Sequence, residues 1–339
     1  MSPLRVRIDG ATRELKTVWL EGDVVRMIDQ RALPFDLRIL DARDLEEVAT
    51  AIEAMAVRGA PAIGAAAAYG LALAEARGME LERGATRLRR TRPTGHDLFA
   101  AIDFVLERVR AGVTAREAAL AYAREDEERC LAIGRHGRRL IKPGMRILTH
   151  CNAGALAAVD HGTAMAPMRA ARDAGVEFFV YVSETRPRLQ GSRLTAWELQ
   201  QEGIDHAIVV DSACGFLIQR GEVDLVLVGA DRIAANGDTA NKVGTYPKAV
   251  VAKANRVPFY VAAPLTTVDF GARSGRAIPI EERDESEVLL VDGTPVAPKG
   301  SHARNFAFDV TPARYVTGFV TDRGILTPAE LRALRRKRR

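Results

Sequence analysis

Apolar and polar residues alternate near the start of the chain. The segment 17–29 reads TVWLEGDVVRMID, and the alternation runs through both sides of Glu21-Gly22-Asp23. A period of two residues is typical of a half-buried β-strand, and a glycine between two such runs favours a tight turn. The pattern therefore predicts a β-hairpin with Gly22 in its turn.

The spacing of apolar residues becomes helical from Asp44 to Leu140. Asp44, Thr94 and Thr114 occupy positions that suit helix N-caps, and Pro61 suits the first turn of an Ala-rich helix. The predicted helices span residues 44–57, 61–77, 94–110 and 114–140. Residues 1–140 are thus expected to form an N-terminal domain with a small β element and a helical body.

The rhythm changes after Pro143-Gly144, where short apolar runs alternate with helical stretches. The predicted strands are 146–149, 177–182, 206–210, 224–228 and 258–262, and the helices between them include 163–174, 194–202 and 242–255. Strand–helix alternation of this kind indicates right-handed crossovers and a parallel sheet covered on both faces. The sequence predicts an α/β fold in which residues 141–339 form a Rossmann-like domain, with ligands bound beyond the carboxyl ends of the strands.

Charge and composition narrow the functional classes. Apolar residues make up 47% of the 339 residues and charged residues 27%, as in a globular protein with a core. The net charge of +5 comes from the basic tail 335–339, since the rest of the chain has 44 basic and 44 acidic residues. A body that follows a nucleic-acid backbone is therefore not expected; the tail suits either an RNA contact or a solvated terminus.

Other features bear on the compartment. The uncharged stretch 59–74 is shorter than the roughly 20 apolar residues of a membrane span, and no signal segment is recognisable at the start. Cys130, Cys151 and Cys214 are too far apart for a zinc framework, and their odd number favours reduced thiols. We therefore expect a cytoplasmic protein without a membrane contact or a bound metal.

Cys151 and Asp231 follow predicted strands directly and are the first candidates for chemistry. Cys151 precedes a helix expected to begin near Gly154, and the helix dipole would favour a thiolate there. The alternative is a small buried side chain, and Cys214 has a similar position, whereas Cys130 lies in a charged helix. Burial of Asp231 would raise its pKa into an acid–base range, although a capping role explains the same position.

Three segments have the residues that bind anions. Arg58-Gly59-Ala60 precedes Pro61, so an arginine and free helix amides would meet a phosphate. Arg186, Arg188 and Gln190 share one loop, and Asn241-Lys242 is expected at the start of another helix. Tight helix packing or surface charge explains the same patterns. His150 is a possible base or a structural group. Nucleotide binding is not expected, because the chain has neither a P-loop nor a strand-linked G-x-G-x-x-G motif.

Five blocks of sequence resemble the methylthioribose-1-phosphate isomerase family. They are VRGAPAIG (57–64), LTHCNAG (148–154), ETRPRLQGSRLTAWEL (184–199), GADRIAANGDTANKVGTY (229–246) and IPIEER (278–283). The resemblance runs from about Val18 to Val316 in the expected order. The wider family includes regulatory subunits of the translation-initiation exchange factor and ribose-1,5-bisphosphate isomerases.

The resemblance implies an aldose–ketose isomerase of methionine salvage. It would convert 5-methylthioribose 1-phosphate into 5-methylthioribulose 1-phosphate, as a homodimer and without a cofactor. Position by position it implies that Cys151 and Asp231 are catalytic. The implied substrate-binding residues are Arg58, Gly59, Ala60, Arg92, Gln190, Asn241 and Lys242. Arg92 enters through the resemblance alone, because it otherwise reads as surface charge.

Some positions depart from the family pattern. They are DSACGFL (211–217), GTYPKAV (244–250) and Phe306 in RNFAFDVTP. These departures leave open a related substrate such as ribose 1,5-bisphosphate or 5-deoxyribose 1-phosphate, and a non-catalytic regulatory role is the remaining alternative. The path of the hydrogen from C2 to C1, as a proton or as a hydride, also stays open.

Overall fold

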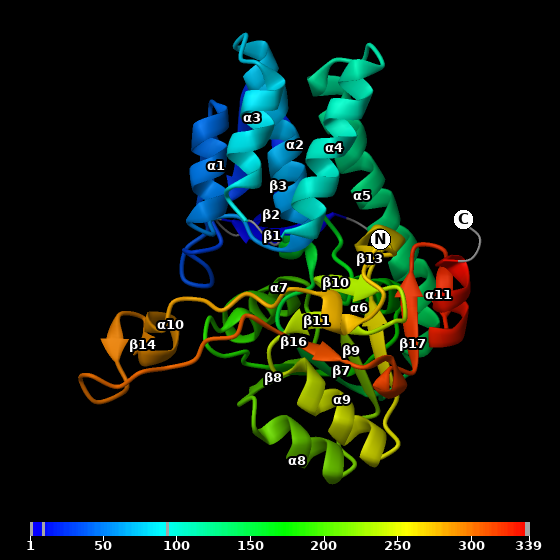
Figure 1. Cartoon of the computed structure of the whole chain (residues 1–339). Coiled ribbons are helices and arrows are strands. Elements are labelled where there is room, and N and C mark those ends of the chain that lie inside the picture. Colours follow the sequence, from blue (N-terminus) through cyan, green and yellow to red (C-terminus); the bar gives the residue numbers. More distant parts are fainter. Residues whose placement is uncertain (1–2, 9–10, 93–94, 336–339) are drawn as a thin grey trace.

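The computed structural model describes residues 3–8, 11–92 and 95–335 (Figure 1). The N-terminal part contains five short strands and five helices. They are β1 (Leu4–Ile8), β2 (Ala11–Leu15), β3 (Val18–Glu21), β4 (Val24–Ile28), β5 (Ile39–Ala42), α1 (Leu45–Glu53), α2 (Ala60–Ala76), α3 (Leu81–Arg89), α4 (His96–Arg110) and α5 (Ala115–Gly137). The predicted hairpin is confirmed, because β3 and β4 pair antiparallel around Gly22, whose φ is +55°.

Two of the N-cap residues suggested by the sequence are found at the starts of helices. Asp44 accepts a hydrogen bond from the Glu47 amide and caps α1, and Thr114 forms a reciprocal capping box with Glu117 at α5. Helix α4 begins at His96 with Gly95 in the N-cap position. Thr94, which the pattern suggested as the cap, lies outside the described residues. Helix α3 and strands β1, β2 and β5 were not predicted.

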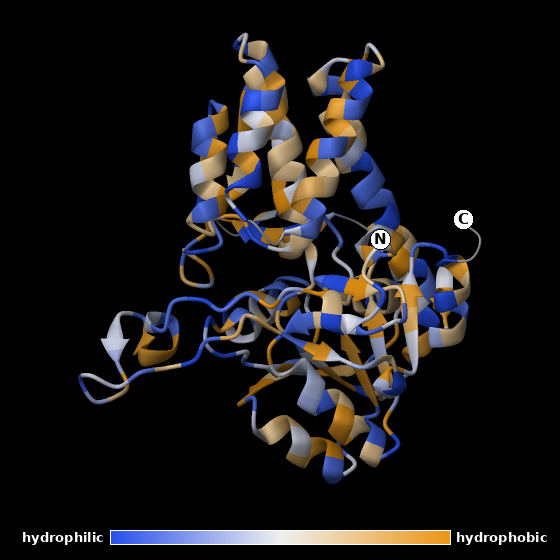
Figure 2. Ribbon diagram, in the orientation of Figure 1, coloured by the Kyte–Doolittle hydropathy of each residue, from blue (hydrophilic) through white to orange (hydrophobic). Residues whose placement is uncertain are grey.

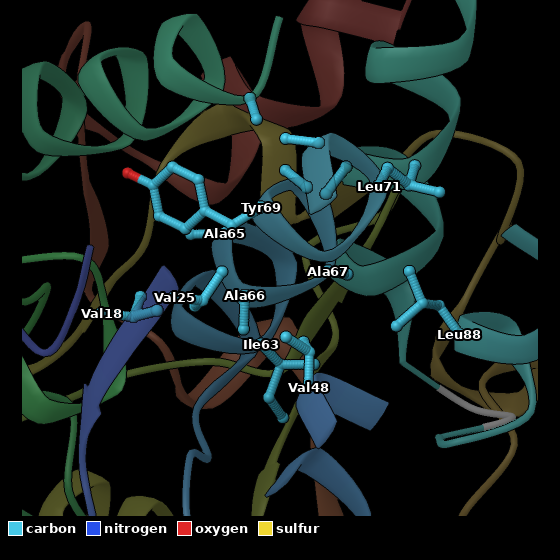
Figure 3. Packing of buried hydrophobic residues seen from close by; sticks show 14 of the residues in the cluster. Val18, Val25, Val48, Ile63, Ala65, Ala66, Ala67, Tyr69, Leu71 and Leu88 are labelled. Atoms are coloured by element: carbon cyan, nitrogen blue, oxygen red, sulfur yellow. The ribbon is translucent and has the colours of Figure 1, made fainter. Parts of the chain in front are cut away.

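Helix α2 is the centre of the helical core (Figure 3). Its alanines are almost entirely buried, and their small side chains let α1, α4 and α5 approach it closely. A Cβ at Gly64 would lie 2.7 Å from the Tyr122 hydroxyl oxygen, so the glycine permits the contact with α5. The Ala- and Gly-rich sequence of α2 is therefore explained largely by packing.

The C-terminal part is built on a seven-stranded sheet in the order β18-β17-β12-β9-β6-β7-β8. Its strands are β6 (Arg146–His150), β7 (Phe179–Ser183), β8 (His206–Val209), β9 (Leu225–Val228), β12 (Phe259–Ala262), β17 (Gly318–Thr321) and β18 (Gly324–Leu326). All neighbouring pairs are parallel except the edge pair β17–β18. The α/β class and the five predicted strands are confirmed, each end within two residues.

Helices cover both faces of this sheet, and its strands are largely orange in Figure 2. Helices α8 (Ala213–Gln219) and α9 (Thr245–Ala254) pack on one face with Phe259 and Val226. Helices α5, α6 (Met165–Asp173) and α7 (Ala196–Gln201) pack on the other with Val180 and Leu225. The short helices α10 (Ser286–Leu289) and α11 (Pro328–Leu334) complete the set in the described chain.

A second sheet, in the order β13-β10-β11-β16, was not predicted. It contains β13 (Val268–Asp269), β10 (Arg232–Ala234), β11 (Thr239–Lys242) and β16 (Phe308–Thr311), and the hairpin β14 (Leu290–Val291) and β15 (Thr294–Pro295) lies further along the chain. These strands have two to four residues each, so their apolar pattern is too short to be recognised. This sheet positions Asp231, Asn241 and Lys242.

The first hairpin of the N-terminal part packs against the C-terminal part of the chain. The first hairpin, β1–β2, packs through Leu4 and Val6 against Leu156 and Trp197 of the C-terminal part. The Leu4 amide also donates to the buried carboxylate of Asp160 at 3.0 Å. The domain boundary that the sequence suggests between residues 140 and 141 stays a prediction. No helix among the described residues has the length and apolar character that crossing a membrane requires.

Candidate active site

A pocket of about 860 Å³, including its open mouth, lies between the start of α2 and the carboxyl ends of β6 and β9. All nine residues suggested by the sequence line it: Arg58, Gly59, Ala60, Arg92, Cys151, Gln190, Asp231, Asn241 and Lys242. These residues come from six separated segments. The fold therefore brings the whole predicted set together, and the roles of the individual residues stay predictions.

Cys151 follows strand β6 directly and has a left-handed backbone, with φ of +64°. This conformation is uncommon for a residue with a Cβ, and the surroundings hold it from both sides. The Cys151 amide donates to the Thr185 hydroxyl oxygen at 2.8 Å, and the Thr195 hydroxyl donates to the Cys151 carbonyl oxygen at 2.6 Å. The thiol is thus placed at the pocket by a fixed turn.

The predicted helix near Gly154 is not present. Only a single 3₁₀ turn, Ala155–Ala157, follows Cys151, and α6 begins at Met165. The expectation that a helix dipole stabilises a thiolate at Cys151 is therefore wrong. Burial raises the pKa of the Cys151 thiol, while the charges of Lys242 and Arg58 oppose this shift.

Asp231 lies between β9 and β10, and its amide donates to the Ala240 carbonyl oxygen at 3.0 Å. Burial raises the pKa of its carboxyl group, whereas the positive charges of Lys242, Arg92 and Arg58 lower it. The negative charge of Asp231 is one further cause of the raised pKa of the Cys151 thiol. The thiol and the carboxyl group therefore share one electrostatic environment.

The segment Arg58–Ala60 leads into α2 at the pocket wall. The Arg58 guanidinium donates from Nε to Gln30 Oε1 at 2.7 Å and from Nη1 to the Asn152 carbonyl oxygen at 3.2 Å. Gly59 has φ of +92°, and a Cβ there would lie 2.4 Å from Ala157 Cα. Only glycine fits this close approach, so the helix start and the turn after Cys151 meet at the pocket.

Asn241 and Lys242 lie in strand β11 and not at a helix start, which corrects the sequence-based expectation; α9 begins three residues later at Thr245. Polar residues occupy this buried strand because their side chains border the pocket. Lys242 Nζ lies 4.7 Å from the ring centre of Phe308, and burial lowers its pKa. Asn241 Nδ2 donates to the Thr245 hydroxyl oxygen at 3.0 Å.

Gln190 and Arg92 contribute further polar groups to the pocket lining. The Gln190 side chain is buried, and its Oε1 has no hydrogen-bond partner among the described residues. That oxygen is available to a ligand hydroxyl group. Arg92 is held by Glu281 at 3.3 Å, which in turn contacts Arg283 at 3.2 Å.

Sequence reasoning missed Arg283 and left Arg188 undecided, although both line the pocket. With Arg58, Arg92 and Lys242 they give five cationic side chains in the lining against the one carboxyl group of Asp231, and Glu281 and Glu287, which do not line the pocket, pair with three of the arginines. No pattern singled out Arg283, which stands in the quoted block IPIEER. The pocket has the charge that a doubly negative phosphate ester requires.

The remaining candidates differ in their relation to the pocket. Arg186 donates to the carbonyl oxygens of Pro187 and Val288 and does not line the pocket. His150 lines the pocket; its Nε2 donates to the Val243 carbonyl oxygen at 2.9 Å, and burial lowers its pKa to about 3, so the ring is neutral. Cys130 and Cys214 are buried away from the pocket. The described residues include no cluster of three or more metal-ligating side chains.

The chain is similar to known proteins over nearly its whole length. The sequence model of the Initiation factor 2 subunit family matches residues 56–328. A methylthioribose-1-phosphate isomerase from Chloroflexus aurantiacus is 49% identical over 95% of this chain and 98% of its own. This chain is a member of the methylthioribose-1-phosphate isomerase family.

Solved structures agree with this membership. The 5-methylthioribose 1-phosphate isomerase from Pyrococcus horikoshii OT3 has a TM-score of 0.87 at 42% identity and covers 96% of both chains. A structure described as translation initiation factor eIF-2B, subunit delta, from A. fulgidus has a TM-score of 0.85 at 41% identity, over 95% of this chain and 100% of that one. The residues of this family member that depart from the family pattern do not line the pocket; they are residues 211–217, 247, 248 and 306.

Proposed function

We propose that this protein isomerises 5-methylthioribose 1-phosphate to 5-methylthioribulose 1-phosphate. The observation that carries the proposal is one pocket lined by five cationic side chains, one half-buried carboxyl group and one half-buried thiol. The cations suit the phosphate, and the two ionisable groups suit the movement of protons on the sugar. Membership of the isomerase family supports the same activity.

The phosphate would be held by Arg58, Lys242 and the start of α2. The first amides of a helix lack intrahelical partners and attract anions, and Gly59 lets the chain approach closely. Gln190 Oε1 and Asn241 are placed to accept or donate at the sugar hydroxyl groups. These contacts would fix C1 and C2 of the sugar between Cys151 and Asp231.

Asp231 is the proposed acid–base group. Protonated Asp231 donates its proton to the ring oxygen as the bond from C1 to that oxygen breaks. The resulting carboxylate accepts the proton of the C2 hydroxyl group as C2 becomes a carbonyl carbon, which restores the acid. The pKa raised by burial supports the first step, and the neighbouring cations support the second.

Cys151 acts on the hydrogen that passes from C2 to C1. Either its thiolate takes that hydrogen as a proton and returns it to C1, or the hydrogen shifts as a hydride while the thiol stabilises the developing charge. Both routes conserve the atoms and electrons of the sugar. The raised pKa of the thiol supports the hydride route, because a base must first lose its proton.

The chemistry of the 5-position is set beyond Asp231. A second compartment of about 680 Å³ adjoins the first, and the two share Gly59, Ala60, Arg92, Asp231 and Phe308. Its apolar walls include Ile63, Leu98 and Ile278, and the carboxyl group of Asp97 also borders it. Arg92 and Arg232 also border this compartment, so the choice of a methylthio group over the phosphate of ribose 1,5-bisphosphate rests on the family membership.

Turnover by the purified protein, without added metal or nucleotide, tests the proposal. We expect the ketose from 5-methylthioribose 1-phosphate and at least 100-fold lower kcat/KM for ribose 1,5-bisphosphate. A preference for the bisphosphate would overturn the assignment of the 5-substituent. No isomerisation of either sugar, together with a stable complex with other initiation-factor subunits in a pull-down, would favour a regulatory role.

We further propose a cytoplasmic homodimer. The edge strand β8 and the adjacent α8 expose Ile208, Val210 and Phe216, which are 49%, 54% and 57% accessible. Exposed apolar side chains at a strand with one free edge support an interface, and a second copy can cover them by two-fold symmetry. No nucleic acid is required by this proposal.

A further inference from the structure

A buried carboxylate lies behind the pocket wall and does not reach the pocket itself. Glu198 of α7 is fully buried and lines no part of the cavity. Its oxygens accept hydrogen bonds from Asn152 Nδ2 at 2.7 Å, the Ala155 amide at 2.8 Å and the Leu156 amide at 3.2 Å. All three partners are N–H donors, so both carboxylate oxygens act as acceptors.

Asn152 connects Glu198 to Arg58. Its Nδ2 faces the carboxylate, while its Oδ1 accepts a hydrogen bond from Arg58 Nη2 and its carbonyl oxygen accepts one from Nη1. Gln30 holds Arg58 Nε from the other side, at 2.7 Å, and itself donates to the Leu156 carbonyl oxygen at 2.7 Å. Three of the five guanidinium N–H groups are thus fixed, which leaves one on each terminal nitrogen.

The direction of this chain of hydrogen bonds follows from its two ends. A guanidinium only donates and a carboxylate only accepts, so the Asn152 amide has one satisfactory orientation. We propose that Glu198 is a positioning residue, which acts through Asn152 to aim Arg58 at the phosphate. The identification of the anion as phosphate rests on the proposed function, whereas the positioning of Arg58 does not.

Gly154 supplies an independent indication that this carboxylate is built into the site. A Cβ at Gly154 would lie 2.2 Å from Glu198 Oε2 and 2.5 Å from Oε1. The glycine of the loop after Cys151 therefore makes room for Glu198. The loop that contains Cys151 and the side chain of Glu198, which is proposed to orient Arg58, therefore meet at Gly154.

A purely structural role is the alternative, in which Glu198 only satisfies the amides of the 155–157 turn. Glu198→Gln separates the two roles when it is combined with Asn152→Asp. In Glu198→Gln, one acceptor oxygen remains for three N–H donors, so the orientation of Asn152, and with it the oxygen that faces Arg58, loses part of its support. The double variant restores an acceptor facing Arg58 and keeps the net charge of the protein, but it does not restore the lost acceptor for the turn.

The measurements are inorganic phosphate binding by calorimetry and KM for 5-methylthioribose 1-phosphate. We expect E198Q to weaken phosphate binding and raise KM at least tenfold with a smaller change in kcat. The double variant N152D/E198Q should recover most of the loss. N152A, which leaves the turn amides paired with Glu198, should weaken binding to the same extent as E198Q.

Glu202 supplies a matched control. It is a buried carboxylate one turn further along, where it pairs with Arg169 and Arg172, and it lines no part of the pocket. E202Q should lower the melting temperature and leave phosphate affinity unchanged. Wild-type phosphate affinity in E198Q or N152A, or a double variant as weak as E198Q alone, would overturn the proposal. Loss and rescue of phosphate binding in a protein that isomerises neither sugar would support it and reject the proposed function.

Discussion

Among single residues, Cys151 and Asp231 share an environment in which burial raises the pKa of both side chains. If they transfer the hydrogen and proton of the sugar, then removing either group should abolish most of the rate. We expect Cys151→Ser and Asp231→Asn each to lower kcat at least ~100-fold, the usual scale for acid–base groups. Cys214→Ser, at a buried cysteine outside the pocket, is the control and should retain activity. Near-normal turnover in either site variant would remove that residue from the mechanism.

The protonation of Cys151 also predicts how the hydrogen moves. A thiol whose pKa is raised is neutral at pH 7 and cannot accept the C2 proton. We therefore expect deuterium placed at C2 of the substrate to appear at C1 of the product in ordinary water, as a hydride shift requires. Mass spectrometry of the product after a single turnover measures it. Exchange of the label with solvent would instead indicate a proton path through a thiolate.

Asp97 makes stability depend on pH. Burial raises its pKa to about 7, with Asp126 and Asp231 adding to the shift and Arg129 and Arg232 opposing it. The folded state therefore keeps this proton up to about pH 7, whereas the unfolded chain loses it near pH 4. The stabilisation is complete below pH 4 and is lost as the pH rises through 7.

We expect Asp97→Asn to melt several degrees higher than the wild type at pH 8 and to show a smaller fall in melting temperature between pH 6 and 8. The pKa values of Asp126 and Asp309 are about 6, so their contributions are largely complete below that window. Tyr122 also faces Asp97, but its raised pKa keeps it neutral throughout. Parallel melting curves for the two proteins would contradict the assignment.

Residue types and spacing identified Cys151, Asp231 and Arg58 because each stands at a strand end or a helix start. Arg92 was found only through the family resemblance, and Glu198 was not found at all. The partner of Glu198 is 46 residues away and Gln30 is 28 residues from Arg58. Such hydrogen bonds depend on the tertiary fold, so no local pattern could predict them.

Among the elements, α2 shows how a backbone requirement shapes the site. Gly59 and Gly78 flank this helix, and both have positive φ, +92° and +69°. A Cβ at Gly59 would collide with the backbone of Ala157, whereas a Cβ at Gly78 meets nothing within 4 Å. Substituting Gly78 therefore measures the loss of stability caused by the positive φ alone, whereas substituting Gly59 adds the loss caused by the collision with Ala157.

We expect Gly78→Ala to lower the free energy of unfolding by about 1 kcal/mol. Gly59→Ala should cost at least twice as much and also weaken phosphate binding, because the helix start and Arg58 must shift. Urea denaturation and phosphate calorimetry measure the two effects. Equal costs for both variants would show that the contact with Ala157 is not needed.

The sequence predicted the strands of the large sheet and missed strand β11, and their side chains explain the difference. The strands of the large sheet are buried on both faces, so they appear as apolar runs such as Leu225–Val228. Strand β11, Thr239–Lys242, is fully buried, but Asn241 and Lys242 at its end are polar and border the pocket. These polar residues interrupt the apolar run by which a buried strand is recognised, and for that reason Asn241 and Lys242 were expected at a helix start.

On the scale of the whole molecule, the sheet has an edge that one chain leaves open. Among the described residues strand β8 pairs only with β7, and Ile208, Val210 and Phe216 of α8 expose apolar side chains. A second copy related by two-fold symmetry can cover this surface and would place the two pockets in one assembly. The proposed homodimer therefore depends on these three side chains.

We expect the wild type to sediment at twice the chain mass of 36.9 kDa, and Val210→Glu combined with Phe216→Glu to sediment as a monomer. A buried carboxylate without a partner is costly at an interface, which is why the charges should separate the copies. Phe35→Glu is the matched control, because Phe35 is 83% exposed on a different surface, and it should leave the dimer intact. A wild-type monomer at micromolar concentration would reject the homodimer. A dimer that survives both substitutions would place the interface elsewhere on the molecule.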